Sequence, residues 1–246
     1  MMKALILNSG LGSRMGVLTK EHPKCMTEIA PGETIVSRQL RLLARAGIRE
    51  VVMTTGFFAD VLREYCEGLS LPLHITYVNN PLCRETNYIY SIYCARDLLR
   101  DDLILMHGDL VFTEDVLREM LGAESSCMAV SSAQPLPEKD FKAVLEGWRE
   151  GNAAGKRILR VGIDFFENAV AAQPLYFLRQ EDWKKWLDEI VAFCEAGNTK
   201  VYAENALNVL NGAAGIRALD TGDRLCAEID NPEDLARVSA ELQKLG

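Results

Sequence analysis

Short apolar runs alternate with segments of helical periodicity along the first half of the chain, and this alternation restricts the fold more than any other feature. The expected strands are 4–7, 51–54, 75–78 and 103–106, and the expected helices between them are 34–46, 59–66 and 87–99. Strands that alternate with helices form a parallel sheet covered by helices. The sequence therefore predicts an α/β protein with a mostly parallel sheet.

The pattern changes after an expected helix at 115–121. Apolar runs at 128–131, 142–148 and 157–163 are expected to be strands, with a polar, glycine-containing hairpin loop at 150–155. These strands predict an antiparallel extension of the sheet. Amphipathic periodicity predicts helices at 182–196 and 234–245. Because the sequence contains no internal repeat, low-complexity tract or linker, we expect a single domain over residues 1–246.

The composition excludes several classes of function. The 246 residues carry a net charge of -8 with a pI of about 5.1, whereas nonspecific nucleic-acid binding needs a basic face. No apolar run reaches the roughly 18 residues of a membrane span, and the first residues do not resemble a signal peptide. We expect a cytoplasmic protein without nucleic-acid or membrane partners, and a homodimer is compatible with the sequence. The seven cysteines are scattered without a CxxC pair, which predicts neither a disulfide framework nor a zinc cluster.

A glycine-rich loop follows the first expected strand directly. It consists of Leu7, Asn8, Ser9, Gly10, Leu11, Gly12, Ser13 and Arg14. Open α/β sheets bind ligands at this edge, where glycines let backbone N–H groups approach phosphate oxygens. A tight turn is the simpler explanation of an isolated GxG, but Arg14 and the nearby Lys24 add two cations for one polyphosphate. We interpret the loop as a triphosphate site; it matches neither a P-loop nor a dinucleotide fingerprint.

Acidic residues are expected at the same edge of the sheet. The apolar run 103–106 leads to Asp109, and a later short strand places Glu228 and Asp230 on one face by the two-residue period of strands. Carboxylates from distant segments suit Mg²⁺, which prefers oxygen ligands. Capping the helix behind Pro232 is the alternative role for Asp230. The three histidines are expected to be structural, although His107 lies close enough to Asp109 to reach a ligand.

Together these features resemble the nucleotide-sugar pyrophosphorylase-like nucleotidyltransferase superfamily, whose members open with a strand, a GxGxR loop and a downstream Pro-Lys pair. The resemblance implies a Rossmann-like nucleotidyltransferase fold and Mg²⁺-dependent transfer of a nucleoside monophosphate to a small phosphorylated acceptor. It assigns the NTP to Leu7, Asn8, Ser9, Gly10, Leu11, Gly12, Ser13, Arg14 and Lys24, catalysis to Lys24, Arg14 and Asp109, and the metal to Asp109, Asp230 and Glu228. The Asn8-Ser9 pair replaces the commoner Ala-Ala near the base, so base selectivity stays open.

An Asn-x-Ile-Tyr-Ser stretch that begins at Asn87 is similar to the choline-phosphate cytidylyltransferase-like branch of this superfamily. This resemblance implies that CTP is the donor and that the acceptor is small and amine-bearing, such as phosphocholine or 2-aminoethylphosphonate. Aromatic faces and carboxylates hold quaternary ammonium groups. The residues expected to bind the acceptor are Asn87, Tyr90, Ser91, Asp164, Tyr176 and Glu204, with helix capping and core packing as their alternative roles.

Two other functions use the same features. A uridylyl- or thymidylyltransferase acting on a sugar 1-phosphate would share the loop and the metal, and a panel of nucleotides would separate it from a cytidylyltransferase. A non-catalytic nucleotide sensor would bind the nucleotide without releasing pyrophosphate.

Overall fold

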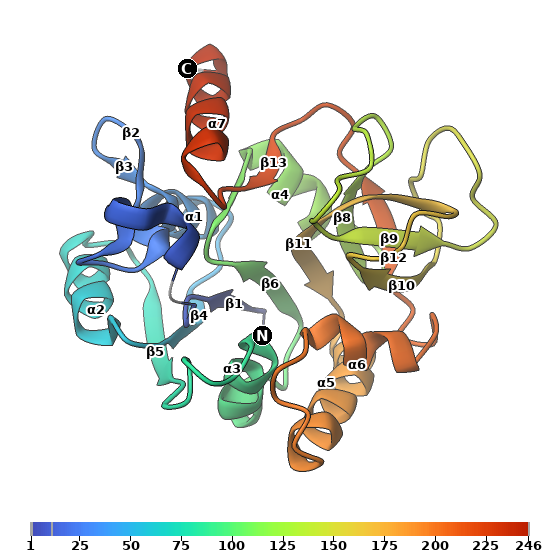
Figure 1. Cartoon of the computed structure of the whole chain (residues 1–246), viewed down its shortest axis with the longest axis horizontal. Helices are drawn as coiled ribbons and strands as arrows, with labels where there is room; N and C mark the ends of the chain where they lie inside the picture. Colours follow the sequence, from blue (N-terminus) through green and yellow to red (C-terminus); the bar gives the residue numbers. More distant parts are fainter. Residues whose placement is uncertain (1, 11, 246) are drawn as a thin grey trace.

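The computed structural model describes residues 2–10 and 12–245, and its centre is a nine-stranded mixed sheet (Figure 1). Within it, β1 (Lys3–Leu7) lies between β4 (Glu50–Thr55) and β6 (Leu103–His107), and β5 (His74–Asn79) pairs with β4 at the edge. All of these pairings are parallel. The four strands expected from the first half of the chain are therefore confirmed, and they place the carboxyl ends of β1 and β6 side by side.

Helices cover both faces of the parallel strands. Alternate residues of β1 and β6 point to opposite faces, so Ile6 and Met106 pack in one core with helices α1 (Ile35–Arg45), α2 (Ala59–Gly68) and α4 (Glu114–Leu121). Leu5 and Leu105 pack in a second core with α3 (Tyr88–Ala95) and α5 (Gln180–Glu195). The helix expected at 87–99 is divided into α3 and a 3-10 turn, η3 (Arg96–Leu98).

The antiparallel extension is confirmed, but it is built around a strand that the sequence did not predict. This strand, β11 (Ala169–Leu178), pairs antiparallel with β6, β8 and β9. Its partners beyond β6 are β8 (Cys127–Ser131) and β9 (Lys142–Leu145). Strand β10 (Ile158–Gly162) pairs antiparallel with β9, whereas β12 (Arg217–Asp220) pairs parallel with β8. Pro174 interrupts the apolar run of β11, and it is accommodated because the register with β8 shifts between Ala172 and Tyr176.

A separate two-stranded ribbon carries the late acidic segment to the end of β6. In it, β7 (Leu110–Phe112) pairs with β13 (Cys226–Glu228), which sets Glu228 opposite Leu110. Helix α7 (Pro232–Leu245) packs on this ribbon through Val238 and Leu242, and Figure 1 shows it rising beside β13. The ribbon therefore brings Glu228 and the residues after it next to Asp109.

The remaining elements are short. They are the 3-10 helices η1 (Ser13–Thr19) and η2 (Lys24–Met26), the hairpin of β2 (Glu28–Ala30) and β3 (Glu33–Thr34), and α6 (Ala203–Val209). Within residues 2–10 and 12–245, no helix has the length and apolar character needed to cross a membrane. The single-domain organisation stays a prediction.

Candidate active site

Three adjoining cavities follow the carboxyl ends of β1 and β6. We call them the loop cavity, lined by Asn8, Gly12 and Lys24 among others, the central cavity around His107 and Glu228, and the outer cavity around Asp164 and Glu204. Their volumes are about 400, 350 and 390 Å³. The loop and central cavities share Arg14, Asn87, Asp109 and Asp230, and the central and outer cavities share Asn87, Phe141, Ile163 and Tyr202. The shared residues make the three cavities one elongated cleft.

The glycine-rich loop lines one end of this cleft. The residues that face the loop cavity include Leu7, Asn8, Gly10, Gly12, Arg14 and Lys24. Gly12 has a left-handed backbone (φ 62°), and a Cβ there would lie 3.0 Å from the Cβ of Lys24, so glycine lets the loop close against this lysine. Leu11 lies outside the described residues. Ser13 begins η1, and its side chain is outside the description as well.

Ser9 and Ser91 occupy a buried position beneath the loop. Their hydroxyl oxygens lie 2.6 Å apart, and the Asn80 amide donates to Ser91 at 2.9 Å. Ser91 is fully buried and lines none of the three cavities. The Ser91 hydroxyl fastens α3 to the loop, and its contact with the acceptor stays a prediction. Ser9 likewise is buried and supports the loop from below.

Lys24 joins two carboxylates at the boundary between the loop and central cavities. Its Nζ donates to Asp109 Oδ2 at 2.6 Å and to Asp230 Oδ1 at 2.5 Å, while Arg14 lies 3.0 Å from Asp230 Oδ2. Burial alone would lower the pKa of Lys24, but the Asp109 charge and both carboxylate bonds outweigh it and raise that pKa. The three predicted catalytic residues, Lys24, Arg14 and Asp109, thus belong to one ionic cluster.

Gly108 sets the position of Asp109. A Cβ at residue 108 would lie 1.6 Å from Asn8 Oδ1 and 2.9 Å from the Leu7 carbonyl oxygen. Only glycine allows the end of β6 to pack so closely against the end of β1. Burial alone would raise the pKa of Asp109, but the charges of Lys24 and His107 lower it. Asp109 is therefore held as a carboxylate.

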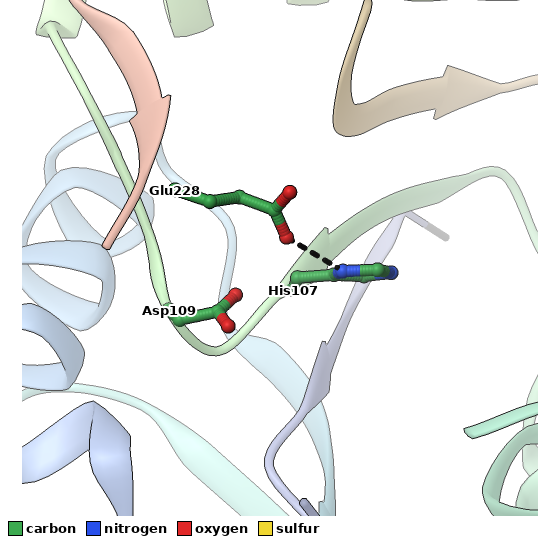
Figure 2. A group of neighbouring side chains, drawn as sticks. All are labelled: His107, Asp109 and Glu228. Carbon is green, nitrogen blue, oxygen red and sulfur yellow. Dashed lines mark hydrogen bonds and ion pairs between the residues drawn. The ribbon is translucent and has the colours of Figure 1, made fainter. Parts of the chain in front are cut away.

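Glu228 and Asp230 have different partners, although both line the central cavity. Strand β13 ends at Glu228, whose Oε1 lies 3.0 Å from His107 Nδ1, as Figure 2 shows. Burial and repulsion by Asp109 raise the pKa of Glu228 to about 7, with His107 opposing the shift. The alternative capping role of Asp230 is taken by Asn231, whose Oδ1 accepts from the backbone of Glu233 and Asp234. The Asp230 carboxylate therefore does not cap the helix and is available for contacts within the site.

Aromatic rings surround the central cavity where it meets the outer one. Tyr88 packs on His107 with ring centroids 4.6 Å apart, and Phe141 lies 5.2 Å from Tyr202 and 6.4 Å from His107. All four rings line the central cavity. Sequence reasoning gave no role to Tyr88 or Phe141, although Tyr88 is the variable residue inside the Asn-x-Ile-Tyr-Ser stretch.

The other residues expected at the acceptor differ in their placement. Asn87 lines all three cavities, and Asp164 and Glu204 line the outer one. Tyr90 stacks on Tyr93 and lines none of the three. Tyr176 is fully buried, packs on Trp186 and donates its hydroxyl to Glu204 at 2.8 Å. Neither ring lines the cleft, because Tyr90 packs on Tyr93 and Tyr176 packs in the core against Trp186, and direct acceptor contact by these two residues stays a prediction.

Several buried polar atoms of the cleft have no hydrogen-bond partner among the described residues. They are Asn8 Nδ2, His107 Nε2 and Asp109 Oδ1. A buried polar atom without a partner destabilises a protein by about 1–3 kcal/mol. Their gathering along one cleft indicates that a bound molecule or ion completes them.

Comparison with known proteins gives a family match and several relatives. The family model of the MobA-like NTP transferase domain matches residues 4–206. CMP-5'-(3-aminopropyl)phosphonate synthase of Streptomyces rubellomurinus is 31% identical over 238 residues, which are 94% of this chain and 37% of that protein. CTP:phosphoglutamine cytidylyltransferase of Campylobacter jejuni is 30% identical over 135 residues, or 52% of each chain. The matched regions thus span about a third to a half of these relatives.

The fold also matches solved structures. The inositol-1-phosphate CTP transferase from T. maritima superimposes with a TM-score of 0.75 at 20% identity, over 98% of this chain and 96% of that chain. At this identity the likeness concerns the fold alone. It confirms the α/β nucleotidyltransferase fold with its mostly parallel core sheet and flanking helices.

Proposed function

Because the chain belongs to the family of MobA-like NTP transferase domains, we propose that it transfers CMP from CTP to a small acceptor that carries both a phosphate or phosphonate and an amino group. Pyrophosphate is the second product. The observation that carries the proposal is the position of Lys24, which lines the glycine-loop cavity and bonds to Asp109 and Asp230, the two carboxylates that this cavity shares with the aromatic, acidic central cavity. A donor phosphate on one side and an acceptor phosphate on the other would meet there.

The reaction needs charge neutralisation more than it needs a base. A phosphomonoester has a second pKa of about 6, so it is already a dianionic nucleophile at neutral pH. Its attack on the α-phosphorus of CTP brings two anions together, and fixed cations lower the resulting repulsion. Lys24 and Arg14 are placed to supply this charge, and the cleft aligns the attacking oxygen with the leaving pyrophosphate.

A divalent ion fits the residues at this boundary. Asp109 and Asp230 offer carboxylate oxygens to the cavity, and Asp109 Oδ1 is buried with no hydrogen-bond partner in the part of the chain that the structure describes. Mg²⁺ takes oxygen ligands and commonly binds through one or two carboxylates together with substrate phosphates. In the proposed reaction the ion would supply additional positive charge at the phosphates of CTP, with Asp109 and Asp230 as its protein ligands.

The amino group of the acceptor has a suitable environment at the opposite end of the central cavity. Tyr202 and Phe141 present aromatic rings, and Glu204 and Asp164 contribute negative charge in the adjoining outer cavity. An ammonium group over an aromatic ring within about 6 Å gains roughly 0.5–2 kcal/mol. The name of the Streptomyces relative, which specifies an aminopropylphosphonate, supports an acceptor of this kind.

A pyrophosphate-release assay tests the proposal. Purified protein with Mg²⁺ is given CTP, UTP, dTTP, ATP or GTP, each combined with phosphocholine, 2-aminoethylphosphonate, 3-aminopropylphosphonate or glucose 1-phosphate. Release that requires CTP and an amine-bearing acceptor, and that is lost in Asp109→Asn, supports the proposal. Release from UTP or dTTP with glucose 1-phosphate would assign the protein to the sugar-phosphate branch. Binding of CTP without release from any acceptor would favour a nucleotide sensor.

A further inference from the structure

We propose that His107, Asp109 and Glu228 form a cation site of their own, whose nitrogen ligand favours a divalent transition ion such as Mn²⁺ over Mg²⁺. This site lies next to the position that Lys24 occupies between Asp109 and Asp230. It goes beyond the proposed function, which assigns one ion to Asp109 and Asp230 and gives His107 and Glu228 no ligand role.

The three side chains converge from separate segments. His107 ends β6, Asp109 follows in the turn, and Glu228 ends β13 on the ribbon above them, as Figure 2 shows. One ligand atom from each residue lies within 4.8 Å of the other two. His107 Nδ1 and Glu228 Oε1 are 3.0 Å apart, which is about the spacing of neighbouring ligands around an octahedral ion with bonds of about 2.1 Å. Small movements of Asp109 would complete a three-ligand set.

The contacts of this set leave carboxylate oxygens without a lysine or arginine. Lys24 bonds to Asp109 through Oδ2, and Asp109 Oδ1 is buried without a hydrogen-bond partner among the described residues. The basic partner of Glu228 is His107, which is itself a metal-ligand type. Among the described residues, Asp109 Oδ1 and the Glu228 carboxylate therefore have no ion pair with lysine or arginine. A cation at this place would neutralise both and satisfy the buried oxygen.

The type of ligand indicates the type of ion. Mg²⁺ and Ca²⁺ are bound by oxygen, whereas an imidazole nitrogen is a ligand for first-row transition ions; within that series Mn²⁺ is the ion that also suits carboxylates, which supply the other two ligands of this set. Aromatic packing holds the imidazole in place. Its ring packs against Tyr88 and Phe141, and the Gln39 amide fixes the backbone of the same residue by donating to the His107 carbonyl oxygen at 2.9 Å. A side chain ordered in this way loses little freedom when the ion binds.

The test uses the full chain without nucleotide or acceptor, so that its result is independent of the proposed reaction. Mn²⁺ binding is titrated by the loss of the free-ion EPR signal, and pulsed EPR of the bound ion detects nitrogen coupling from imidazole. We expect bound Mn²⁺ to show this coupling. His107→Gln should remove it and weaken Mn²⁺ binding at least about tenfold.

His74 provides a matched control. Its Nδ1 lies 2.9 Å from Glu50 Oε2, the same type of pair as His107 with Glu228, but the His74 side chain is 72% exposed and has no third ligand. His74→Gln should leave both the affinity and the nitrogen coupling unchanged. If His107→Gln does not fold, Glu228→Gln serves as the second variant, with the same expected weakening.

Asp230→Asn separates the two cation positions. Because Asp230 belongs to the Lys24 cluster and not to the three-residue site, nitrogen coupling should persist in this variant. Bound Mn²⁺ without nitrogen coupling in the unaltered protein would overturn the proposal. Unchanged Mn²⁺ affinity in a folded His107→Gln protein would overturn it as well.

Discussion

Replacing Lys24 by methionine tests the centre of the proposed site. The substitution keeps an unbranched apolar stem and removes the ammonium, which bonds to Asp109 Oδ2 at 2.6 Å and to Asp230 Oδ1 at 2.5 Å. Breaking a buried ion pair costs about 3–5 kcal/mol, and an exposed pair is worth about 0–1 kcal/mol. The side chains of Lys24, Asp109 and Asp230 are 12%, 21% and 17% exposed, so we expect a loss of about 2 kcal/mol in unfolding free energy.

Activity should fall much further than stability. In the proposed reaction Lys24 neutralises charge in the transition state, and the loss of one such element lowers turnover by about 10²–10³-fold. Turnover is measured by pyrophosphate release, and stability by thermal and urea unfolding. Lys20→Met is the control, because Lys20 is an exposed lysine close by in the sequence. Turnover in Lys24→Met equal to that of the control would refute the catalytic role.

The same variant should respond more strongly to Mg²⁺. Lys24 and a metal ion would both be held by the carboxylates of Asp109 and Asp230, so removing the ammonium removes a competitor. A ligand present at 100 times its dissociation constant stabilises the folded protein by about 2.7 kcal/mol. We therefore expect added Mg²⁺ to raise the melting temperature of Lys24→Met more than that of the unaltered protein. Equal increases in both proteins would show that the lysine and the ion do not compete.

Four further outcomes are expected. Gly108→Ala should lower the unfolding free energy by about 1–3 kcal/mol, because the added Cβ would lie 1.6 Å from Asn8 Oδ1. Urea unfolding measures the change, and an unchanged unfolding free energy would contradict the close packing of residue 108 against Asn8. Asn8→Ala should raise the KM for CTP several-fold without changing the acceptor KM, since the buried Nδ2 has no hydrogen-bond partner among the described residues. Steady-state kinetics with each substrate varied in turn measures both KM values. Tyr202→Ala should raise the acceptor KM about tenfold and leave the KM for CTP unchanged, and the reverse pattern would move the acceptor elsewhere. In EDTA, the unfolding free energy should fall as the pH rises from about 4.5 to about 7, because the raised pKa of Glu228 means that the folded state holds the carboxyl proton more tightly than the unfolded state. Glu228→Gln should flatten this dependence of stability on pH, and stability that rises with pH would contradict the raised pKa.

The parallel core was predictable because its signals are local. Apolar runs, helical periodicity and the Gly-Asp ending of β6 lie in continuous stretches, so they placed the loop and Asp109 at the same edge of the sheet. By contrast, β11 was missed because Pro174 and its neighbouring glutamine divide its apolar run. The strand forms because long-range pairing with β6 and β8 compensates for the proline. The sequence of residues 169–178 alone does not indicate such pairing.

The acceptor end was harder to predict because helix α3 is apolar on nearly every side. Its sequence, from Tyr88 to Ala95, contains no polar stripe that would fix which residues face the cleft. Tyr88 faces the central cavity, whereas Tyr90 and Ser91 do not. The hydrogen bond between Ser91 and Ser9 holds the helix in this rotation about its own axis. The motif could identify the helix as a wall of the site, but only the packing shows which of its side chains reach the ligand.

The ionic cluster explains how an acidic protein with a net charge of -8 can receive a triphosphate. Lys24 bonds to the carboxylates of Asp109 and Asp230, and the more exposed Arg14 pairs with Asp230, so both cations already have a partner at the site. In the proposed reaction the nucleotide phosphates would bind the two cations while the accompanying ion would bind the two carboxylates. The partly buried charges of Lys24, Asp109 and Asp230 would each exchange one partner for another, and none would be left unpaired where an isolated charge is most costly. This exchange also predicts that nucleotide and ion bind together more tightly than either binds alone.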